Sequence, residues 1–235
     1  MRHVLLIRQS EESVSLADRL LAKDISCSLY PLLAPRFLPS PTLLHPQALM
    51  MTSKNAVRAL GEHSPYRHLP LYVVGDETAA FAKKYGYDTI HNASGTVEDL
   101  VDCVSATASR IQGTLWHLSG DVVRGNLVHI LREKGFDAER RIVYRMEEAQ
   151  ALPPSLIQEL QDGRMTDVLF LSPRTATLFG ALLAQAGLEG ATSKMTALCL
   201  SQNVVQRITH LTWGLVWVSP KPTLDALMGY FDEKE

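Results

Sequence analysis

Small hydroxyl residues and glycines recur at one kind of place in this 235-residue chain, just after a short apolar run and just before a segment with helical periodicity. They are Ser10, Ser53, Gly75 with Thr78, Ser119 with Gly120, Ser172 and Ser201. In an open parallel sheet such turns line the ligand crevice, where helix N-termini present free N–H groups to an anion. The same residues are common N-caps, each contributing about 0.5 to 2 kcal/mol to helix stability. The pattern therefore indicates either ordinary caps or an anion-binding cleft.

Cations recur at or just after these turns. They are Arg8, Lys54, Arg124 and Arg174. Taken singly, each is explained as solvated surface charge. Taken together, they would add positive charge to a cleft already supplied with N–H donors, which suits a polycarboxylate better than a neutral sugar. Tyr144 is placed where a side chain can face the same cleft, and a tyrosine at the edge of a core would have the same position.

The common catalytic signatures are missing from the sequence. It has no GxGxxG or Walker loop, no GxSxG, no HExxH and no paired CxxC. Nucleotide-binding, serine-hydrolase and zinc-enzyme classes therefore lose support, and we expect no metal and no cofactor. The histidines lack partners at metal-ligand spacing, and we expect His117 and His129, like His63 and His68, to be surface or hydrogen-bonded structural residues.

The elements that must position these residues alternate between β-rich runs and helical patterns. The segment HVLLIR, His3 to Arg8, is a near-continuous apolar run, as expected of a strand buried on both faces. The helix after it is predicted to place Leu16, Ala17, Leu20 and Leu21 on one face. Similar strand and helix pairs begin at LWHL and VLFL. This alternation predicts an α/β fold with parallel sheets.

Two proline-containing stretches interrupt the alternation, at residues 31–41 and 144–154. Proline blocks helices and central strands, so both are predicted to be extended crossings between two bodies. Three pairs of segments resemble each other in the same order and at similar separation, which indicates a duplicated α/β unit. They are LMMTSKNAVRAL with VLFLSPRTATLF, VVGDETAAFAKKYG with LCLSQNVVQRITHLTWG, and TVEDLVD with TLDALMG. We therefore expect one domain from residues 1–36 plus 147–235, and an inserted domain from residues 37–146.

Composition limits the expected partners and the expected cellular compartment of the protein. The net charge is -2 and the cations are scattered, so nucleic acid is not an expected partner. No run approaches the roughly 20 apolar residues of a membrane span, and the amino terminus does not have the pattern of a signal peptide. Cys27, Cys103 and Cys199 are odd in number and far apart, which predicts free thiols and a cytoplasmic protein.

The order of these motifs resembles that of the uroporphyrinogen-III synthases over essentially the whole length. The segments are VLLIRQSEES, MTSKNAVRAL, LYVVGDETAAFAKKYG, LWHLSGDVVRGNLVHILREKGFDAERRIVY and DVLFLSPRTATLF. The resemblance implies two flavodoxin-like lobes joined by a two-stranded connector, with the active site in the cleft between them. It maps Tyr144 onto the tyrosine proposed to assist catalysis. It also implies that seven residues correspond to cleft positions of the family. They are Thr52, Ser53, Gly75, Thr78, Gly120, Arg124 and Ser172. The LSQNVV turn at Ser201 departs from the usual Gly followed by Thr-Ala, so substrate contact there is less well supported.

The resemblance also implies a substrate and a reaction. Hydroxymethylbilane would lose its hydroxyl, close through a spiro intermediate and give the macrocycle with ring D inverted, with Tyr144 as phenol donor. Hydroxymethylbilane synthase is a candidate supplier of the substrate, and a monomer is expected. Two rival classes stay open. One is a non-catalytic two-lobed protein that binds a small anion, although such proteins are typically exported. The other is a sugar-nucleotide transferase, for which the chain is short and lacks a diphosphate loop.

Overall fold

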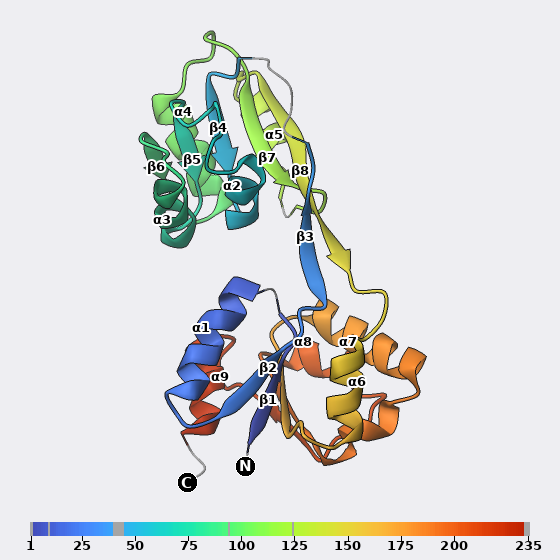
Figure 1. Cartoon of the computed structure of the whole chain (residues 1–235). Helices are drawn as coiled ribbons and strands as arrows, with labels where there is room; N and C mark the ends of the chain where they lie inside the picture. Colours follow the sequence, from blue (N-terminus) through green and yellow to red (C-terminus); the bar gives the residue numbers. More distant parts are fainter. Residues whose placement is uncertain (1, 9, 40–44, 94, 124, 233–235) are drawn as a thin grey trace. The chain divides into compact units, whose positions relative to one another are not determined.

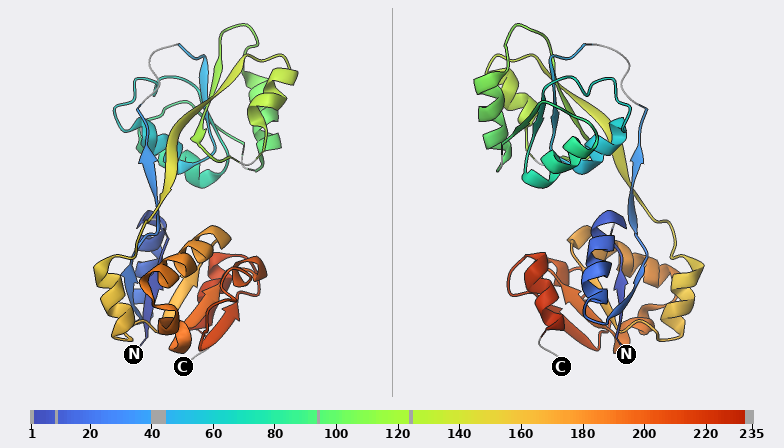
Figure 2. Two further views of the ribbon diagram at one scale, coloured as in Figure 1. Left: turned by 90° about the vertical axis from the view of Figure 1, so that its right-hand side faces the viewer. Right: turned by 60° about the vertical axis from the view of Figure 1, so that its left-hand side comes forward.

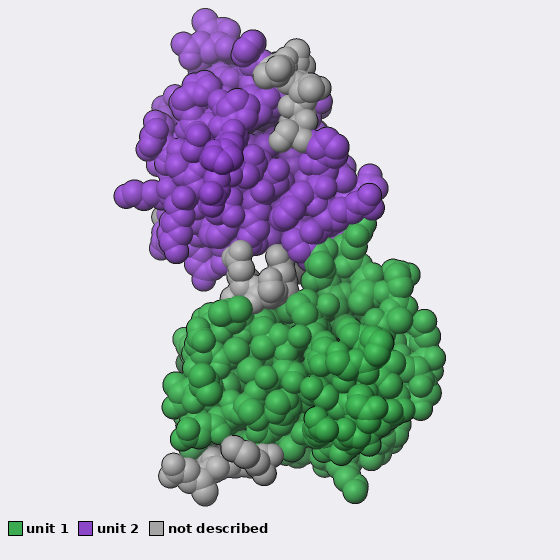
Figure 3. Space-filling model, viewed as in Figure 1, with its two compact units in different colours: residues 1–34, 147–235 green, residues 35–146 purple. Residues whose placement is uncertain are grey.

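The computed structural model describes residues 2–8, 10–39, 45–93, 95–123 and 125–232, without the side chains of residues 10–12. The chain divides into two compact units (Figure 3). Unit 1 is Met1–Ala34 with Glu147–Glu235, and unit 2 is Pro35–Met146. Each unit is an α/β body with its own sheet, so each is described by itself.

Unit 1 is built on a five-stranded sheet whose strands all run parallel (Figure 1). In spatial order the strands are β11 (Leu215–Val218), β10 (Thr196–Cys199), β9 (Asp167–Phe170), β1 (His3–Leu6) and β2 (Ser26–Leu29). Strands β1 and β2 come from the start of the chain, and β9, β10 and β11 come from its last third. Numbered within the unit, the order is 2-1-3-4-5, which is the flavodoxin-like arrangement.

Helices cover both faces of this sheet (Figure 2). Val4 and Leu6 of β1 pack against the helices on one face. Leu5 and Ile7 pack against the helices on the opposite face. One face carries α1 (Ser10–Leu21), α9 (Leu224–Met228) and the 3-10 turn η2 (Gly229–Phe231). The other carries α6 (Pro154–Gln161), α7 (Pro173–Ala186), η1 (Glu189–Lys194) and α8 (Gln202–Val205). Alternate side chains of one strand thus serve two cores, which explains the unbroken apolar run in the sequence.

Unit 2 repeats this plan around a second sheet. Its spatial order is β3 (Leu33–Phe37), β8 (Ala138–Glu148), β7 (Leu115–Gly120), β4 (Ala48–Met51), β5 (Leu71–Val73) and β6 (Ile90–Asn92). From β8 to β6 the pairing is parallel throughout. One face packs against α2 (Lys54–Leu60) and α3 (Asp76–Lys84). The other packs against α4 (Val97–Thr107) and α5 (Leu127–Glu133).

Two extended strands, β3 and β8, carry the chain between the units and lie next to each other in the sheet order. The backbone N–H of Leu38 donates to Val143 O at 2.9 Å, and that of Ala149 donates to Leu32 O at 2.9 Å. Pro35 lies in β3 at the edge of the sheet, where its missing N–H costs the fewest ladder bonds. The prediction of an α/β fold with two parallel sheets, the first built from both ends of the chain, is confirmed.

The repeated segments occupy equivalent places in the two sheets. The β4 and α2 pair corresponds to β9 and α7, β5 and α3 correspond to β10 and α8, and α4 corresponds to α9. When β7, α5 and β8 are matched to β1, α1 and β2, five strands have the same order in both sheets, and β3 is an additional edge strand of the second sheet. Unit 2 therefore has the arrangement of unit 1 with the chain entering at a different strand.

No helix among the described residues combines the length and the apolar character that a membrane crossing needs.

Candidate functional site

The candidate residues divide into two groups, one at the carboxyl edge of each sheet. In unit 2, Ser53 follows β4 and Gly120 ends β7, and these strands are neighbours. In unit 1, Ser172 follows β9 and Arg8 follows β1, and these strands are also neighbours. In both sheets the helices after the two strands cover opposite faces, so this is the point where the strand order reverses. Open α/β sheets bind ligands at the carboxyl ends of the strands at this point.

Tyr144 of β8 joins the unit 2 group. Its ring is 9% exposed, and its hydroxyl donates to Ser53 Oγ at 3.3 Å. Ser53 is the N-cap of α2 and its Oγ also accepts from the N–H of Asn55 at 3.2 Å. The Ser53 hydroxyl therefore accepts two hydrogen bonds, and its own proton is left to donate to a third group.

A β-bulge puts the Tyr144 ring on this side of the sheet. Ser119 pairs with Ile142 and Gly120 pairs with Tyr144, so β8 has one extra residue, Val143, at this point. Successive strand residues normally face opposite sides, yet Val143 and Tyr144 both pack in the core beneath α2 and α3. The bulge resolves this conflict, because an extra residue re-aims the side chain that follows it.

Gly120 makes room for that ring. A Cβ at this position would lie 2.8 Å from Tyr144 Cζ, 2.9 Å from Cε2 and 3.0 Å from the phenol oxygen. These distances are too short for any side chain, and the ring is buried. The glycine is thus required by the close approach of a tyrosine rather than by a left-handed backbone.

Arg140, which the sequence analysis did not single out, fixes the turn after β7. Its Nε donates to Ser119 Oγ at 2.9 Å, and one amino nitrogen donates to Gly120 O at 2.5 Å and Asp121 O at 2.6 Å. Ser119 is buried, and its hydroxyl donates to Gly120 O at 3.1 Å. One guanidinium therefore holds oxygens of three consecutive residues, among them the glycine against Tyr144. An arginine on a neighbouring strand carries no sequence signal for this role.

His117 differs from the prediction of a surface or hydrogen-bonded histidine. Its ring is 5% exposed, and Nε2 has no hydrogen-bond partner among the described residues. Burial, followed by the charge of Arg140, lowers the pKa of His117 from 6.5 to about 4. The imidazole is therefore neutral at neutral pH. The prediction was wrong because β7 is a central strand, and no spacing rule shows which of its side chains meets a cation.

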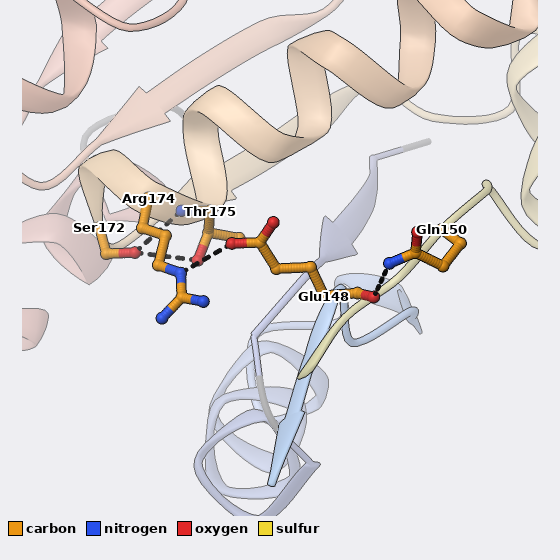
Figure 4. Close-up of polar contacts among 5 residues, drawn as sticks. All are labelled: Glu148, Gln150, Ser172, Arg174 and Thr175. Atoms are coloured by element: carbon orange, nitrogen blue, oxygen red, sulfur yellow. Dashed lines mark hydrogen bonds and ion pairs between the residues drawn. The ribbon is translucent and has the colours of Figure 1, made fainter. Parts of the chain in front are cut away.

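The corner after β9 in unit 1 uses its polar groups internally (Figure 4). Ser172 caps α7 by accepting from the N–H of Thr175 at 3.2 Å, and the two hydroxyls lie 2.9 Å apart. Arg174 Nε donates to Glu148 Oε1 at 2.9 Å, and Gln150 Nε2 donates to Glu148 O at 2.9 Å. The capping interpretation is thus confirmed for Ser172, as it is for Ser53.

Three other candidates lie around α3 and the start of α2. Lys54 Nζ is 2.8 Å from Glu77 Oε2, so its charge is paired within unit 2. Gly75 occupies the N-cap position of α3 with a φ of 85°, a conformation that favours glycine. Thr78 is buried in the same helix. Acidic residues, Asp76 and Glu77, occupy the first turn of α3.

The remaining candidates are Ser201, Thr52, Arg8 and Arg124. Ser201 is at the N-cap position of α8, without a capping hydrogen bond from its side chain. Thr52 is half-buried beside Ser53, and Arg8 is exposed beyond β1. Arg124 lies outside the described residues. Roles in substrate binding stay predictions for all of these positions. Across the described part of the chain, no cluster of three or more His, Cys, Asp or Glu side chains could hold a metal ion.

The fold and these corners define a protein of two flavodoxin-like units that carries hydroxyl, amide and cationic groups at the carboxyl edges of its sheets. The model of the family Uroporphyrinogen-III synthase HemD matches residues 15–229. The chain belongs to this family.

Two solved structures are similar to this chain, and the first supports the fold. Uroporphyrinogen-III synthetase from Helicobacter pylori 26695 is similar with a TM-score of 0.63 at 17% identity, over 99% of each chain. A mutant uroporphyrinogen III synthase from Thermus thermophilus gives a TM-score of 0.47 at 17% identity, over 100% of each chain. No curated protein matches the sequence.

Proposed function

We propose that this protein is a uroporphyrinogen-III synthase, a lyase that closes hydroxymethylbilane to uroporphyrinogen III with loss of water and inversion of ring D. Membership of the family supports this proposal. The observation that carries it is the paired hydroxyls of Tyr144 and Ser53 at the point where the strand order of unit 2 reverses. A positioned hydroxyl can donate the proton that a departing hydroxide needs, and these two are bonded to each other.

The first step is departure of the substrate hydroxyl. Ser53 accepts from Tyr144, so it can donate its own proton to the leaving oxygen and take the phenol proton in return. Water leaves, and the bilane becomes an azafulvene cation. The substituted carbon of the terminal pyrrole attacks this cation to give the spiro intermediate. Fragmentation and closure at the other carbon then invert ring D and release a proton, which returns to the Tyr144 phenolate through Ser53.

Selectivity in this reaction comes from position. The bilane cyclises unaided to the type I isomer, so the protein must hold one folded arrangement of the chain. We propose that groups at the carboxyl edges of the sheets bind the carboxylates of the bilane. Backbone N–H groups at the α2 and α7 starts and the cations Arg8, Lys54 and Arg174 are the candidates. Each helix terminus that meets a carboxylate contributes about 0.3 to 1 kcal/mol.

The decisive experiment resolves the isomers. Purified protein is supplied with freshly made hydroxymethylbilane, the products are oxidised, and isomers I and III are separated. We expect type III as the main product, against type I in a reaction without protein. Type I alone would reject the synthase proposal. If the protein also bound the bilane without turnover, the rival of a non-catalytic anion-binding protein would take its place.

A further inference from the structure

A cavity of about 280 Å³ lies in unit 2 beside β7, β8 and α5. His117 lines it from β7, between Trp116 and Leu118, which pack in the core under α2 and α3. Because side chains alternate along a strand, His117 faces the α5 side of the sheet. Tyr144 packs on the α2 side. The cavity is therefore separate from the paired hydroxyls of Tyr144 and Ser53.

The charged groups of the cavity are all of one sign. Arg140 lines it from β8, and Arg132 lines it from α5. Arg132 Nε donates to Ala138 O at 2.7 Å, and Arg140 donates to the three oxygens of the β7 turn. Within the described ranges, neither guanidinium has a carboxylate partner, and none of the lining residues is acidic. Two guanidinium groups at one hollow, each with amino hydrogens left over, favour an anion.

His117 adds an unsatisfied polar atom to the same wall. The ring is more than nine-tenths buried, and Nε2 lacks a partner within the described part of the chain. A buried polar atom without a partner costs about 1 to 3 kcal/mol. The two guanidinium groups, rather than this nitrogen, therefore favour an anion in the cavity.

Gly125, Asn126 and His129 also line the cavity. Its apolar side chains are Val123, Leu127 and Val128. Its volume is several times the ~30 Å³ that one water molecule occupies in the liquid. We propose that this cavity binds a short aliphatic carboxylate, with the carboxylate on Arg132 and Arg140 and the methylene groups against these three side chains.

Such a carboxylate can come from two sources. One is an acetate or propionate arm of the bilane, in which case the cavity is a subsite of the proposed reaction. The other is a separate small carboxylate that binds beside the substrate. Arg140 would connect either ligand to the turn after β7, because its guanidinium lines the cavity and also donates to Gly120 O.

The test uses succinate and ¹⁵N-labelled full-length protein. Saturable shifts are expected for the backbone amides of residues 125–128 as succinate is added, and chloride at equal ionic strength should not reproduce them. Arg132→Gln removes one cation with one backbone contact and should weaken succinate binding at least 10-fold. Arg110→Gln is the matched control, because Arg110 Nε likewise donates to a backbone carbonyl, that of Lys134, in the same unit. It should leave the affinity unchanged.

Kinetics with the bilane then identify the source. If the occupant is a substrate arm, succinate raises the KM for hydroxymethylbilane, and Arg132→Gln raises it with little change in kcat. If it is a separate ligand, succinate binds while this KM stays constant. The cavity proposal is overturned if succinate gives no saturable shift, or if Arg132→Gln binds it as tightly as the wild type. Failure to convert the bilane would reject the synthase proposal alone, because the succinate titration does not depend on turnover.

Discussion

Ser53 in unit 2 and Ser172 in unit 1 occupy equivalent corners, and their backbones are nearly alike, with φ and ψ of -152° and 140° against -150° and 148°. Their surroundings differ. Ser172 bonds within its own helix, to Thr175. Ser53 accepts in addition from Tyr144, a residue on another strand. The comparison teaches that the same backbone corner can hold serines with different partners. In unit 2 the contact with Tyr144 links the capping serine to a second hydroxyl.

A second difference lies in the strands next to β9 and β4, which are β1 in unit 1 and β7 in unit 2. On its α1 face, β1 of unit 1 presents Val4 and Leu6. On its α5 face, the equivalent β7 of unit 2 presents Leu115 and the buried His117. Unit 2 thus has a buried histidine on the face where β1 of unit 1 presents aliphatic side chains.

The largest expected effect comes from removing the phenol of unit 2. Tyr144→Phe should lower the rate of type III formation by about 10²- to 10⁴-fold, because one positioned proton donor contributes about that much. The fold should be retained, since the ring still fills its place. Tyr30, which ends the equivalent repeat in unit 1, supplies the control, and Tyr30→Phe should turn over normally. Wild-type turnover from Tyr144→Phe would remove the phenol from the mechanism.

Next in size is the pH dependence of stability. The folded-state pKa of His117 is about 4, against 6.5 for an ordinary histidine. Between these values the unfolded chain binds a proton that the folded chain does not, so the free energy of unfolding falls as pH falls from 6.5 to 4. The loss is roughly 3 kcal/mol.

Urea unfolding at a series of pH values measures this loss. The titratable side chains that line the cavity with His117 are those of Arg140, Arg132 and His129, and none of them is acidic. His117→Gln should flatten the profile between pH 4 and 6.5 relative to the wild type. His129→Gln, at a more exposed position on α5, should not. Parallel profiles for wild type and His117→Gln would show that His117 does not carry the linkage.

A smaller effect is expected from closing the space beside Tyr144. Gly120→Ala should destabilise the protein by about 1 to 3 kcal/mol, because the added methyl overlaps a buried ring. It should also lower turnover by displacing the phenol from Ser53. Gly190→Ala is the control, since a Cβ there meets nothing within 4 Å. Unchanged stability and turnover in Gly120→Ala would show that the ring relocates without cost.

The smallest effect separates the two serines. Ser53→Ala and Ser172→Ala each remove a capping hydroxyl, so each should lower the free energy of unfolding by about 0.5 to 2 kcal/mol in urea titrations. Only Ser53→Ala should also reduce kcat, because only Ser53 is bonded to Tyr144. Equal kcat values in the two variants would contradict the proton relay while leaving the caps intact.

The sequence by itself determined the fold class. The apolar run at residues 3–8, the helical stripes and the prolines near residues 31–41 suffice for two parallel sheets with crossings, because burial on two faces leaves a periodic record in residue type. The capping roles of Ser53 and Ser172 could be inferred for the same reason, since a cap is a local contact. The domain boundaries and the substrate roles of the corner residues stay predictions.

Only the tertiary structure decided which groups meet. The bulge between Ser119 and Gly120, the fit of Gly120 against the Tyr144 ring and the three contacts of Arg140 join strands that are distant in sequence. The same holds for the burial of His117 beside a guanidinium. Side-chain type and local spacing carry no record of register, and a shift of one residue in β8 would turn Tyr144 to the opposite face.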